Sequence, residues 1–279
     1  MDNWMGGRGK DYRRTPVKSF GLEAYWVTVR PPPSKRVILY LHGGGFMFRM
    51  PAVHSRLAAR LCHELDAEAL IPHYRCAPEY PLPAAHDDCY AAYAWLLAEG
   101  FDPAQIIVAG DSAGGLLTLS TLQRVRDAGL PAPMCGVMFS PGTCFEALRS
   151  LQAHSVEQDP MLGAGIVDLL WRIVIEPLGH YDGAMLGKVS PCAAGLHDLP
   201  PLLFQAGSTE ALLHQSVKAH ALALDAGTHA ELQVWPHMPH VWQAVHWLPE
   251  AREALACVTD FVRRHAHRHG LCPDLRLRD

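Results

Sequence analysis

Long hydrophobic runs are missing from this chain of 279 residues. No stretch approaches the run of about 18 apolar residues typical of a membrane-spanning helix, and residues 1–10 lack the apolar segment of a signal peptide. An excess of one charge is also missing, because 24 Lys and Arg residues oppose 28 Asp and Glu residues, for a net charge of −4. We therefore expect a cytoplasmic protein that binds neither a membrane nor a nucleic acid.

Sequence motifs of metal and nucleotide sites are absent, although the chain has 17 histidines. His63-Glu64 is not followed by the second histidine of a zinc-protease helix, because Ala67 stands at that position. Neither a Gly-x-Gly-x-x-Gly pattern nor a Walker pattern occurs. The histidines of 265–269 fit a solvated basic helix end better than a metal site. We expect no metal and no cofactor.

The composition predicts one domain with reduced thiols. Residues 1–279 are 49% hydrophobic and 19% charged, which is ordinary for a single α/β domain with a large core. Several cysteines lie in apolar helix or strand patterns, where buried thiols are expected. The eight cysteines are dispersed at positions 62, 76, 89, 135, 144, 192, 257 and 272.

Apolar runs typical of strands alternate with longer runs typical of helices. This alternation predicts a doubly wound, mostly parallel sheet with helices on both faces. Residues 1–20, which are polar and basic, and residues 141–191, which break the rhythm, are expected to be cap elements. The expected strands are 22–30, 36–41, 67–74, 105–109, 134–140, 201–207 and 231–235, and the expected helices are 53–66, 86–99, 114–128, 165–175, 211–226 and 249–267.

The candidate nucleophile is Ser112, in the stretch Gly110-Asp-Ser-Ala-Gly114. A buried strand precedes this stretch and a helix follows it, so a sharp turn must join the two. Small residues are needed in such a turn because strand and helix approach closely, and the strained backbone presents the serine oxygen.

A serine nucleophile needs a base, and the base needs a group that orients it. Catalytic groups collect at the carboxyl ends of parallel strands. Glu210 and His240 follow the last two expected strands, and Ser112, Glu210, His240 is the nucleophile, acid, base order of α/β-hydrolases. His237 in the same loop remains a rival base. The alternative acids are Asp198 and Asp225.

The stretch His42-Gly-Gly-Gly45 is a candidate oxyanion hole. Backbone N–H donors that are already aimed at a tetrahedral oxyanion contribute about 3–4 kcal/mol each, and glycine allows the close approach. We expect Gly43 and Gly44 to supply two donors and Ala113, after the nucleophile, to supply the third.

Together these motifs resemble the hormone-sensitive-lipase-like branch of the α/β-hydrolases, the bacterial carboxylesterases and acetyl esterases. The resemblance implies an eight-stranded sheet with a small cap, and it matches Glu210 and His240 to the family's acid and base. The stretches that carry it, in family order, are His42-Gly-Gly-Gly-Phe46, Tyr74-Arg-Cys-Ala-Pro-Glu-Tyr-Pro-Leu-Pro-Ala-Ala85, Asp102-Pro103, Gly110-Asp-Ser-Ala-Gly-Gly115, Ser190-Pro191, Leu199-Pro-Pro-Leu-Leu203, Gly207-Ser-Thr-Glu210 and His240-Val-Trp242.

Two departures from the family bear on substrate size: Arg49 stands where glycine is common, and the N-terminal cap is short. Phe46, Trp171 and Trp242 are candidates for an apolar substrate pocket. The resemblance implies a serine esterase acting on small-molecule short-chain acyl esters. The alternatives are an amidase, formamidase or peptidase with the same triad, or a non-catalytic ligand-binding protein on the same fold. The sequence leaves open whether the chain forms a homo-oligomer.

Overall fold

The computed structural model describes residues 11–19, 21–29, 34–144, 159–178 and 188–268. The strands are β1 (Tyr12–Ser19), β2 (Leu22–Val29), β3 (Arg36–Leu41), β4 (Ala67–Pro72), β5 (Ile106–Asp111), β6 (Cys135–Phe139), β7 (Leu202–Gly207) and β8 (Ala230–Trp235). The main helices are α2 (Pro51–Leu65), α3 (Ala84–Ala98), α4 (Ala113–Asp127), α7 (Ala164–Leu170), α9 (Leu213–Asp225) and α10 (Pro249–Arg268).

All eight strands belong to one sheet, with the order β1-β2-β4-β3-β5-β6-β7-β8. β1 pairs antiparallel with β2, and β2 pairs antiparallel with β4, while every later pair is parallel. The predicted doubly wound, mostly parallel sheet is therefore confirmed.

The expectation that residues 1–20 form a cap element is wrong for 12–19, which form the edge strand β1. This strand pairs along its whole length with β2, from Tyr12 opposite Val29 to Ser19 opposite Leu22. Its side chains are half-buried or exposed, and Tyr12 and Val17 pack only partly against the two cores, so its backbone hydrogen bonds to β2 are its main attachment. Residues 1–10 lie outside the described residues.

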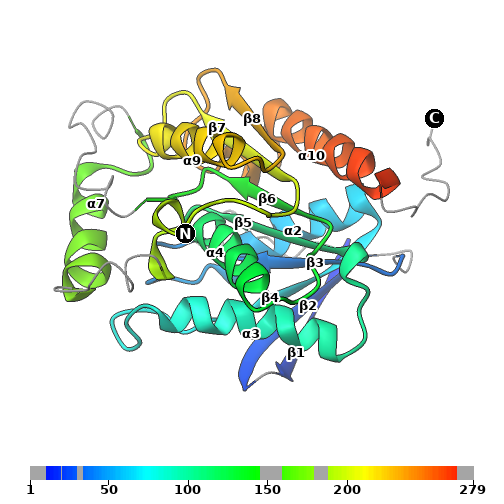
Figure 1. The fold of residues 1–279 in the computed structure, drawn as a ribbon. Coiled ribbons are helices and arrows are strands. Elements are labelled where there is room, and N and C mark those ends of the chain that lie inside the picture. The colour runs from blue at the N-terminus through cyan, green and yellow to red at the C-terminus, as the bar shows by residue number, and fades with distance from the viewer. Residues whose placement is uncertain (1–10, 20, 30–33, 145–158, 179–187, 269–279) are drawn as a thin grey trace.

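Two helical layers cover the two faces of the sheet, as Figure 1 shows: α3, α4 and α9 lie on one face, and α2 and α10 on the other. Side chains of a strand point alternately to the two faces. In β3, Val37, Leu39 and Leu41 pack into the core under α3 and α4, while Ile38 and Tyr40 pack into the core under α2 and α10. A sheet buried on both faces explains why β3 is apolar throughout.

The described part of 141–191 adds no strand to the sheet. It holds α7, which continues into a π-helical turn (Trp171–Ile175) and a 3-10 turn (Glu176–Leu178). In Figure 1, α7 lies at the left of the view, and its Leu170 packs against the core under α3 and α4. We refer to residues 141–191 as the insertion.

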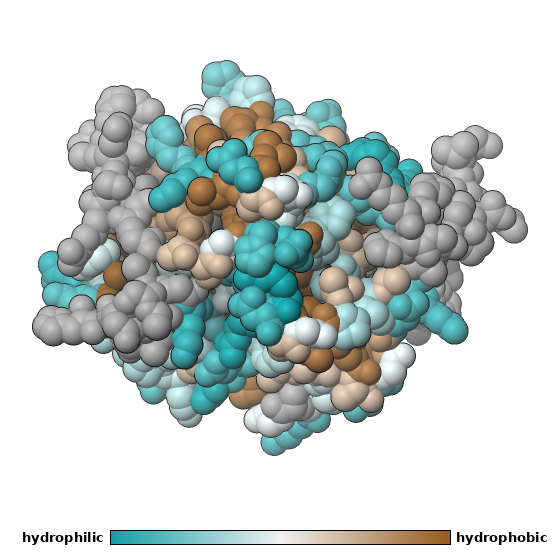
Figure 2. All heavy atoms as spheres, viewed as in Figure 1, coloured by the Kyte–Doolittle hydropathy of each residue, from teal (hydrophilic) through white to brown (hydrophobic). Residues whose placement is uncertain are grey.

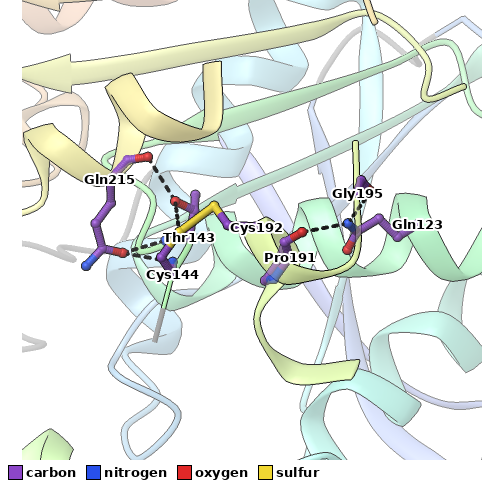
Figure 3. The surroundings of a disulfide bond; sticks show 7 residues. All are labelled: Gln123, Thr143, Cys144, Pro191, Cys192, Gly195 and Gln215. Carbon is purple, nitrogen blue, oxygen red and sulfur yellow. Dashed lines mark hydrogen bonds between the residues drawn. A yellow bond between two sulfur atoms is a disulfide. The ribbon is translucent and has the colours of Figure 1, made fainter. Parts of the chain in front are cut away.

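The two ends of the insertion are joined by a disulfide between Cys144 and Cys192, so the expectation of reduced thiols is wrong for this pair. Figure 3 shows that buried glutamines hold the flanking backbone. Gln215 of α9 accepts hydrogen bonds from the N–H groups of Thr143 (2.7 Å) and Cys144 (3.1 Å). Gln123 of α4 donates to the carbonyl of Pro191 (2.9 Å), the last residue of the insertion.

The surface in Figure 2 is mixed, with apolar side chains gathered over α9 and its neighbours near the top of the view. Val217 and Leu224 of α9 are exposed apolar residues. Among the helices of the described residues, none is long and apolar enough to cross a membrane.

Candidate active site

Ser112 lies in a strained turn between β5 and α4. Its backbone has φ 53° and ψ −119°, which a residue with a side chain rarely adopts. A Cβ added to Gly114 would lie 1.9 Å from the carbonyl oxygen of Leu41, and one added to Gly110 would lie 2.3 Å from that of Gly114. The glycines are therefore required by the close contact of β3, β5 and α4, as expected for a nucleophile elbow.

Glu210 and His240 form a buried pair at the ends of β7 and β8. The Oε2 atom of Glu210 lies 3.5 Å from the Nδ1 atom of His240, and the two side chains are almost completely inaccessible. The rival base His237 is exposed. Both alternative acids, Asp198 and Asp225, are exposed, so Glu210 is the carboxylate that the structure brings to His240.

The acid and base loops are locked together by backbone contacts. The hydroxyl of Thr209 donates to the carbonyl of Met238 (2.8 Å), and the N–H of His237 donates to the hydroxyl of Ser208 (2.8 Å). A Cβ on Gly207 would lie 2.0 Å from the Met238 carbonyl oxygen, so only glycine permits this approach. The stretch 207–210 therefore supplies both the acid and the surface on which the base loop packs.

Several contacts place His240 beside the elbow. The N–H of Val241 donates to the hydroxyl of Ser140 (3.0 Å), which directly follows β6, the neighbour of β5. Burial raises the pKa of Asp111, and the nearby charge of His240 is among the effects that lower it. Because the N–H of Ser112 donates to the carbonyl of Phe139 (2.8 Å), the residue before Ser140, the elbow and the base loop meet at the end of β6.

The glycine loop after β3 is anchored on Asp111. The Oδ1 atom of Asp111 accepts hydrogen bonds from the Tyr40 hydroxyl (2.7 Å) and from the N–H of Gly43 (3.1 Å). Gly43 is thus already paired in this structure, contrary to the expectation that its N–H faces an oxyanion. The N–H groups of Gly44 and Ala113 have no acceptor among the described residues. The same is true of Gly45.

His42 supports this loop as a neutral, buried side chain. Burial, and then the charge of His54, lower the pKa of His42 to about 3. Its ring stacks on Tyr74 at a centroid distance of 4.1 Å, and the Tyr74 hydroxyl donates to the His42 carbonyl (2.7 Å). His42 therefore acts through packing, and it fixes where the glycine loop begins.

The three pocket candidates have different surroundings. Trp242 is 0% exposed and packs with Ala251 and Ala254 beneath α10, so the expectation that it lines a substrate pocket is wrong. Phe46 is 2% exposed and stacks on His86, which leaves it little surface to offer. Trp171 is half-buried in the insertion and packs against the core under α4.

A hollow of about 390 Å³ lies beside the glycine loop, and no triad residue lines it. Arg49 stands in this hollow and donates to the carbonyl of Tyr74 (2.8 Å). The position that departs from the family pattern thus shapes the surface near the site. The hollow is lined by Met47, Arg49, Cys76, Glu79 and Tyr80.

A second group of polar side chains lies at the amino end of β8, the end away from His240. His229, Glu231 and His265 have ligand-type atoms within 4.8 Å of one another. Arg264 already donates two hydrogen bonds to the Glu231 carboxylate, at 2.7 and 2.9 Å, and supplies the positive charge that a cation would bring. His265 is 2% exposed, which corrects the expectation of a solvated residue.

Sequence reasoning missed two buried residues that contact the loops of the candidate site. Asp111 occupies the variable position of the elbow motif. Nothing in the sequence indicates that it accepts hydrogen bonds from Tyr40 and Gly43. Asp159 in the insertion is buried and contacts the acid loop. Its only signal was an aspartate followed by Pro160, which is typical of a turn.

The sheet, the elbow after β5, and the acid and base loops after β7 and β8 define the α/β-hydrolase class with a serine nucleophile elbow. Comparison with known proteins agrees, since a family model described as alpha/beta hydrolase fold matches residues 38–244. The chain belongs to this family, in its hormone-sensitive-lipase branch.

Named relatives and solved structures cover most of the chain. An acetyl-hydrolase of Streptomyces hygroscopicus is 38% identical, over 82% of this chain and 75% of its own length. The esterase LipU of Mycobacterium tuberculosis is 35% identical, over 82% of this chain and 78% of its own. The crystal structure of an esterase from the bacterial hormone-sensitive lipase family has a TM-score of 0.87 and 34% identity, covering 95% of this chain and 89% of that one.

Proposed function

We propose that this protein is a serine carboxylesterase that hydrolyses short-chain acyl esters through an acyl-enzyme intermediate. The observation that carries the proposal is the strained Ser112 elbow after β5 together with the buried Glu210–His240 pair in the loops after β7 and β8 of the same sheet. The similarity to an acetyl-hydrolase and to esterases favours ester hydrolysis over hydrolysis of an amide by the same three residues.

In the proposed mechanism Ser112 attacks the ester carbonyl carbon while His240 takes the hydroxyl proton. Glu210 contacts Nδ1 of His240, keeps the tautomer in which Nε2 accepts, and stabilises the imidazolium. The C–O bond then breaks, and the alcohol leaves with the proton from His240. Water attacks the acyl-enzyme in the same way, and the acid is released. No cofactor takes part.

The tetrahedral oxyanion is bound by backbone N–H groups that have no other acceptor among the described residues. Gly44 and Ala113 keep the role expected from the sequence. Gly43 is replaced in this role by Gly45, because the Gly43 N–H is bonded to Asp111. Each such donor contributes about 3–4 kcal/mol to stabilising the transition state.

A small substrate fits the position of the insertion. A Cβ added to Gly45 would lie 3.3 Å from Cδ1 of Leu170 in α7, so the insertion packs directly on the glycine loop. This contact leaves little room above the expected oxyanion site and supports a preference for short acyl chains. The proposed partner is accordingly a small-molecule ester, with no role for a nucleic acid or a membrane.

We propose the cytoplasm as the location of the protein. The free thiols favour this proposal, and the disulfide opposes it. Five described cysteines are free thiols, which favours a reducing compartment: Cys62, Cys76, Cys89, Cys135 and Cys257. The Cys144–Cys192 disulfide favours an oxidising one.

The test uses p-nitrophenyl esters from acetyl to dodecanoyl with the wild type and with Ser112→Ala. We expect kcat of the variant to fall about 10³-fold or more, because a serine triad without its nucleophile retains only binding and oxyanion stabilisation. The wild type should prefer acetyl to butanoyl esters. A Ser112→Ala variant with substantial activity would refute the mechanism, and an optimum at twelve carbons would refute the substrate size.

A further inference from the structure

Among the described residues of the insertion, Asp159 is a buried carboxylate, 4% exposed. Its Oδ1 atom accepts hydrogen bonds from the N–H groups of Met161 (2.8 Å) and Leu162 (2.9 Å). Its Oδ2 atom accepts a hydrogen bond from the N–H of Ala211 (2.8 Å), 52 residues further along the chain. One side chain thus binds both the turn before α7 and the loop that carries Glu210.

Ala211 is the residue directly after Glu210, and it is 0% exposed. The Glu210 carboxylate has no hydrogen-bond donor among the described residues. Its Oε2 atom lies 3.5 Å from Nδ1 of His240. Its position therefore depends on the backbone of the loop that carries it. The Asp159–Ala211 hydrogen bond fixes that backbone within one residue of the acid.

We propose that Asp159 is a positioning residue: it holds the Glu210 loop through Ala211 so that the carboxylate meets Nδ1 of His240. The inference rests on the proposed function, in which Glu210 orients the base. Without this acceptor, the Ala211 N–H is buried with no partner, which is unfavourable enough for the loop to move. A shift of the acid loop changes the orientation of His240 and slows proton transfer from Ser112.

The rival explanation is that Asp159 only stabilises the turn before α7. Asp159→Asn separates the two roles, because an amide group has one acceptor oxygen and one NH₂ donor. The oxygen can keep the local turn, while the NH₂ group faces the N–H of Ala211, which needs an acceptor. Asp159→Ser is a second variant, since its hydroxyl suits the local turn but is shorter than the carboxylate that reaches Ala211.

The decisive experiment is a double-mutant cycle with Glu210→Gln, measured as kcat and KM on p-nitrophenyl butyrate. We expect Asp159→Asn to lower kcat about tenfold or more, with KM changed less than about twofold, because a buried N–H loses its acceptor. In the Glu210→Gln background the same change should alter kcat less than about twofold, because the group being positioned no longer acts.

The matched control is Asp168→Asn, which removes the same charge from an exposed position of α7 where the carboxylate pairs with Arg172. It should leave kcat unchanged. Equal losses from Asp159→Asn in both backgrounds, or a lowered melting temperature with kcat intact, would overturn the inference. If Asp159→Asn does not fold, Asp159→Ser is judged by the same criteria. Failure of the proposed function is distinct, because Ser112→Ala and Glu210→Gln would then retain activity.

Discussion

At the scale of single residues, two buried histidines link the fold to pH. Burial lowers the pKa of His42 to about 3 and that of His86 to about 4. A free imidazole titrates near pH 6.5, so below that pH the unfolded chain binds protons that the folded chain does not. These two histidines therefore destabilise the folded state least above pH 6.5, and their contribution lowers the free energy of unfolding as the pH falls toward 4.

Replacement of His86 should weaken this dependence. The Nε2 atom of His86 lies 3.3 Å from the Val189 carbonyl, and a glutamine can donate to that carbonyl without titrating. Between pH 6 and pH 5 we expect the urea-derived free energy of unfolding of His86→Gln to fall less steeply than that of the wild type, by up to about 1.4 kcal/mol per pH unit. His197→Gln, at an exposed position, is the control. Parallel slopes in all three proteins would contradict the account.

Sequence reasoning proposed Ser112, Glu210 and His240 because each lies in the turn or loop after a strand of a parallel sheet, and the structure brings Glu210 and His240 within 3.5 Å of each other. It failed for Gly43, whose N–H is bonded to Asp111. It also failed for Trp242, which is buried beneath α10. Position along the chain predicts which loop a residue belongs to. It does not show where an N–H or a ring points, because that depends on neighbours from distant strands.

At the scale of elements, replacing a glycine by alanine should have opposite effects on stability in the elbow and in the insertion. A Cβ on Gly114 would lie 1.9 Å from the Leu41 carbonyl oxygen, whereas one on Gly165 in α7 meets nothing within 4 Å. Gly114→Ala should lower the free energy of unfolding by about 3 kcal/mol or more, because backbone atoms cannot yield. Gly165→Ala should raise helix stability by about 0.5–1 kcal/mol.

Urea denaturation of both variants, together with fluorophosphonate labelling of Ser112, checks this contrast. Gly114→Ala should lose labelling as well as stability, since the elbow and the packing of α4 on β3 depend on the same close contact. Gly165→Ala should label like the wild type. Wild-type stability in Gly114→Ala would show that strand and helix can separate at no cost.

Element boundaries were predicted within a few residues wherever apolar periodicity marks a buried face, as in α4 and β7. The missed element, β1, has no such signal. Its sequence Tyr-Arg-Arg-Thr-Pro-Val-Lys-Ser is held by its ladder to β2 rather than by burial. Sequence patterns report burial, so a strand that buries little is predicted only once its partner is known.

At the scale of the whole molecule, one covalent bond joins Cys144, near the start of the insertion, to Cys192, directly after its end. Cys144 and Cys192 are 48 residues apart, and no spacing rule indicated that they would meet. Their proximity follows from the tertiary positions of Gln215 and Gln123, which hold the two chain segments. Connectivity of this kind depends on the assembled fold, and so lies beyond local sequence reasoning.

Loss of this bond should destabilise the protein as a whole. In the chain-entropy model, opening a loop of this length costs about 4 kcal/mol of folding free energy. We expect Cys144→Ser/Cys192→Ser to melt at a lower temperature than the wild type, and dithiothreitol to lower the wild-type melting temperature but not that of the variant. Each single serine variant should behave like the double variant, because either change removes the same crosslink.

Thiol trapping in acid-quenched cells measures whether the Cys144–Cys192 disulfide is formed in the compartment where the protein resides. Maleimide applied to the unfolded chain should leave Cys144 and Cys192 unlabelled where the disulfide is intact, and should label both where the compartment keeps them reduced. Labelling of both would agree with the cytoplasmic proposal, and the enzyme would then work without this crosslink. Two unlabelled cysteines at these positions would place the protein in an oxidising environment. Identical melting of oxidised and reduced protein would show that the non-covalent contacts of the insertion suffice to hold it.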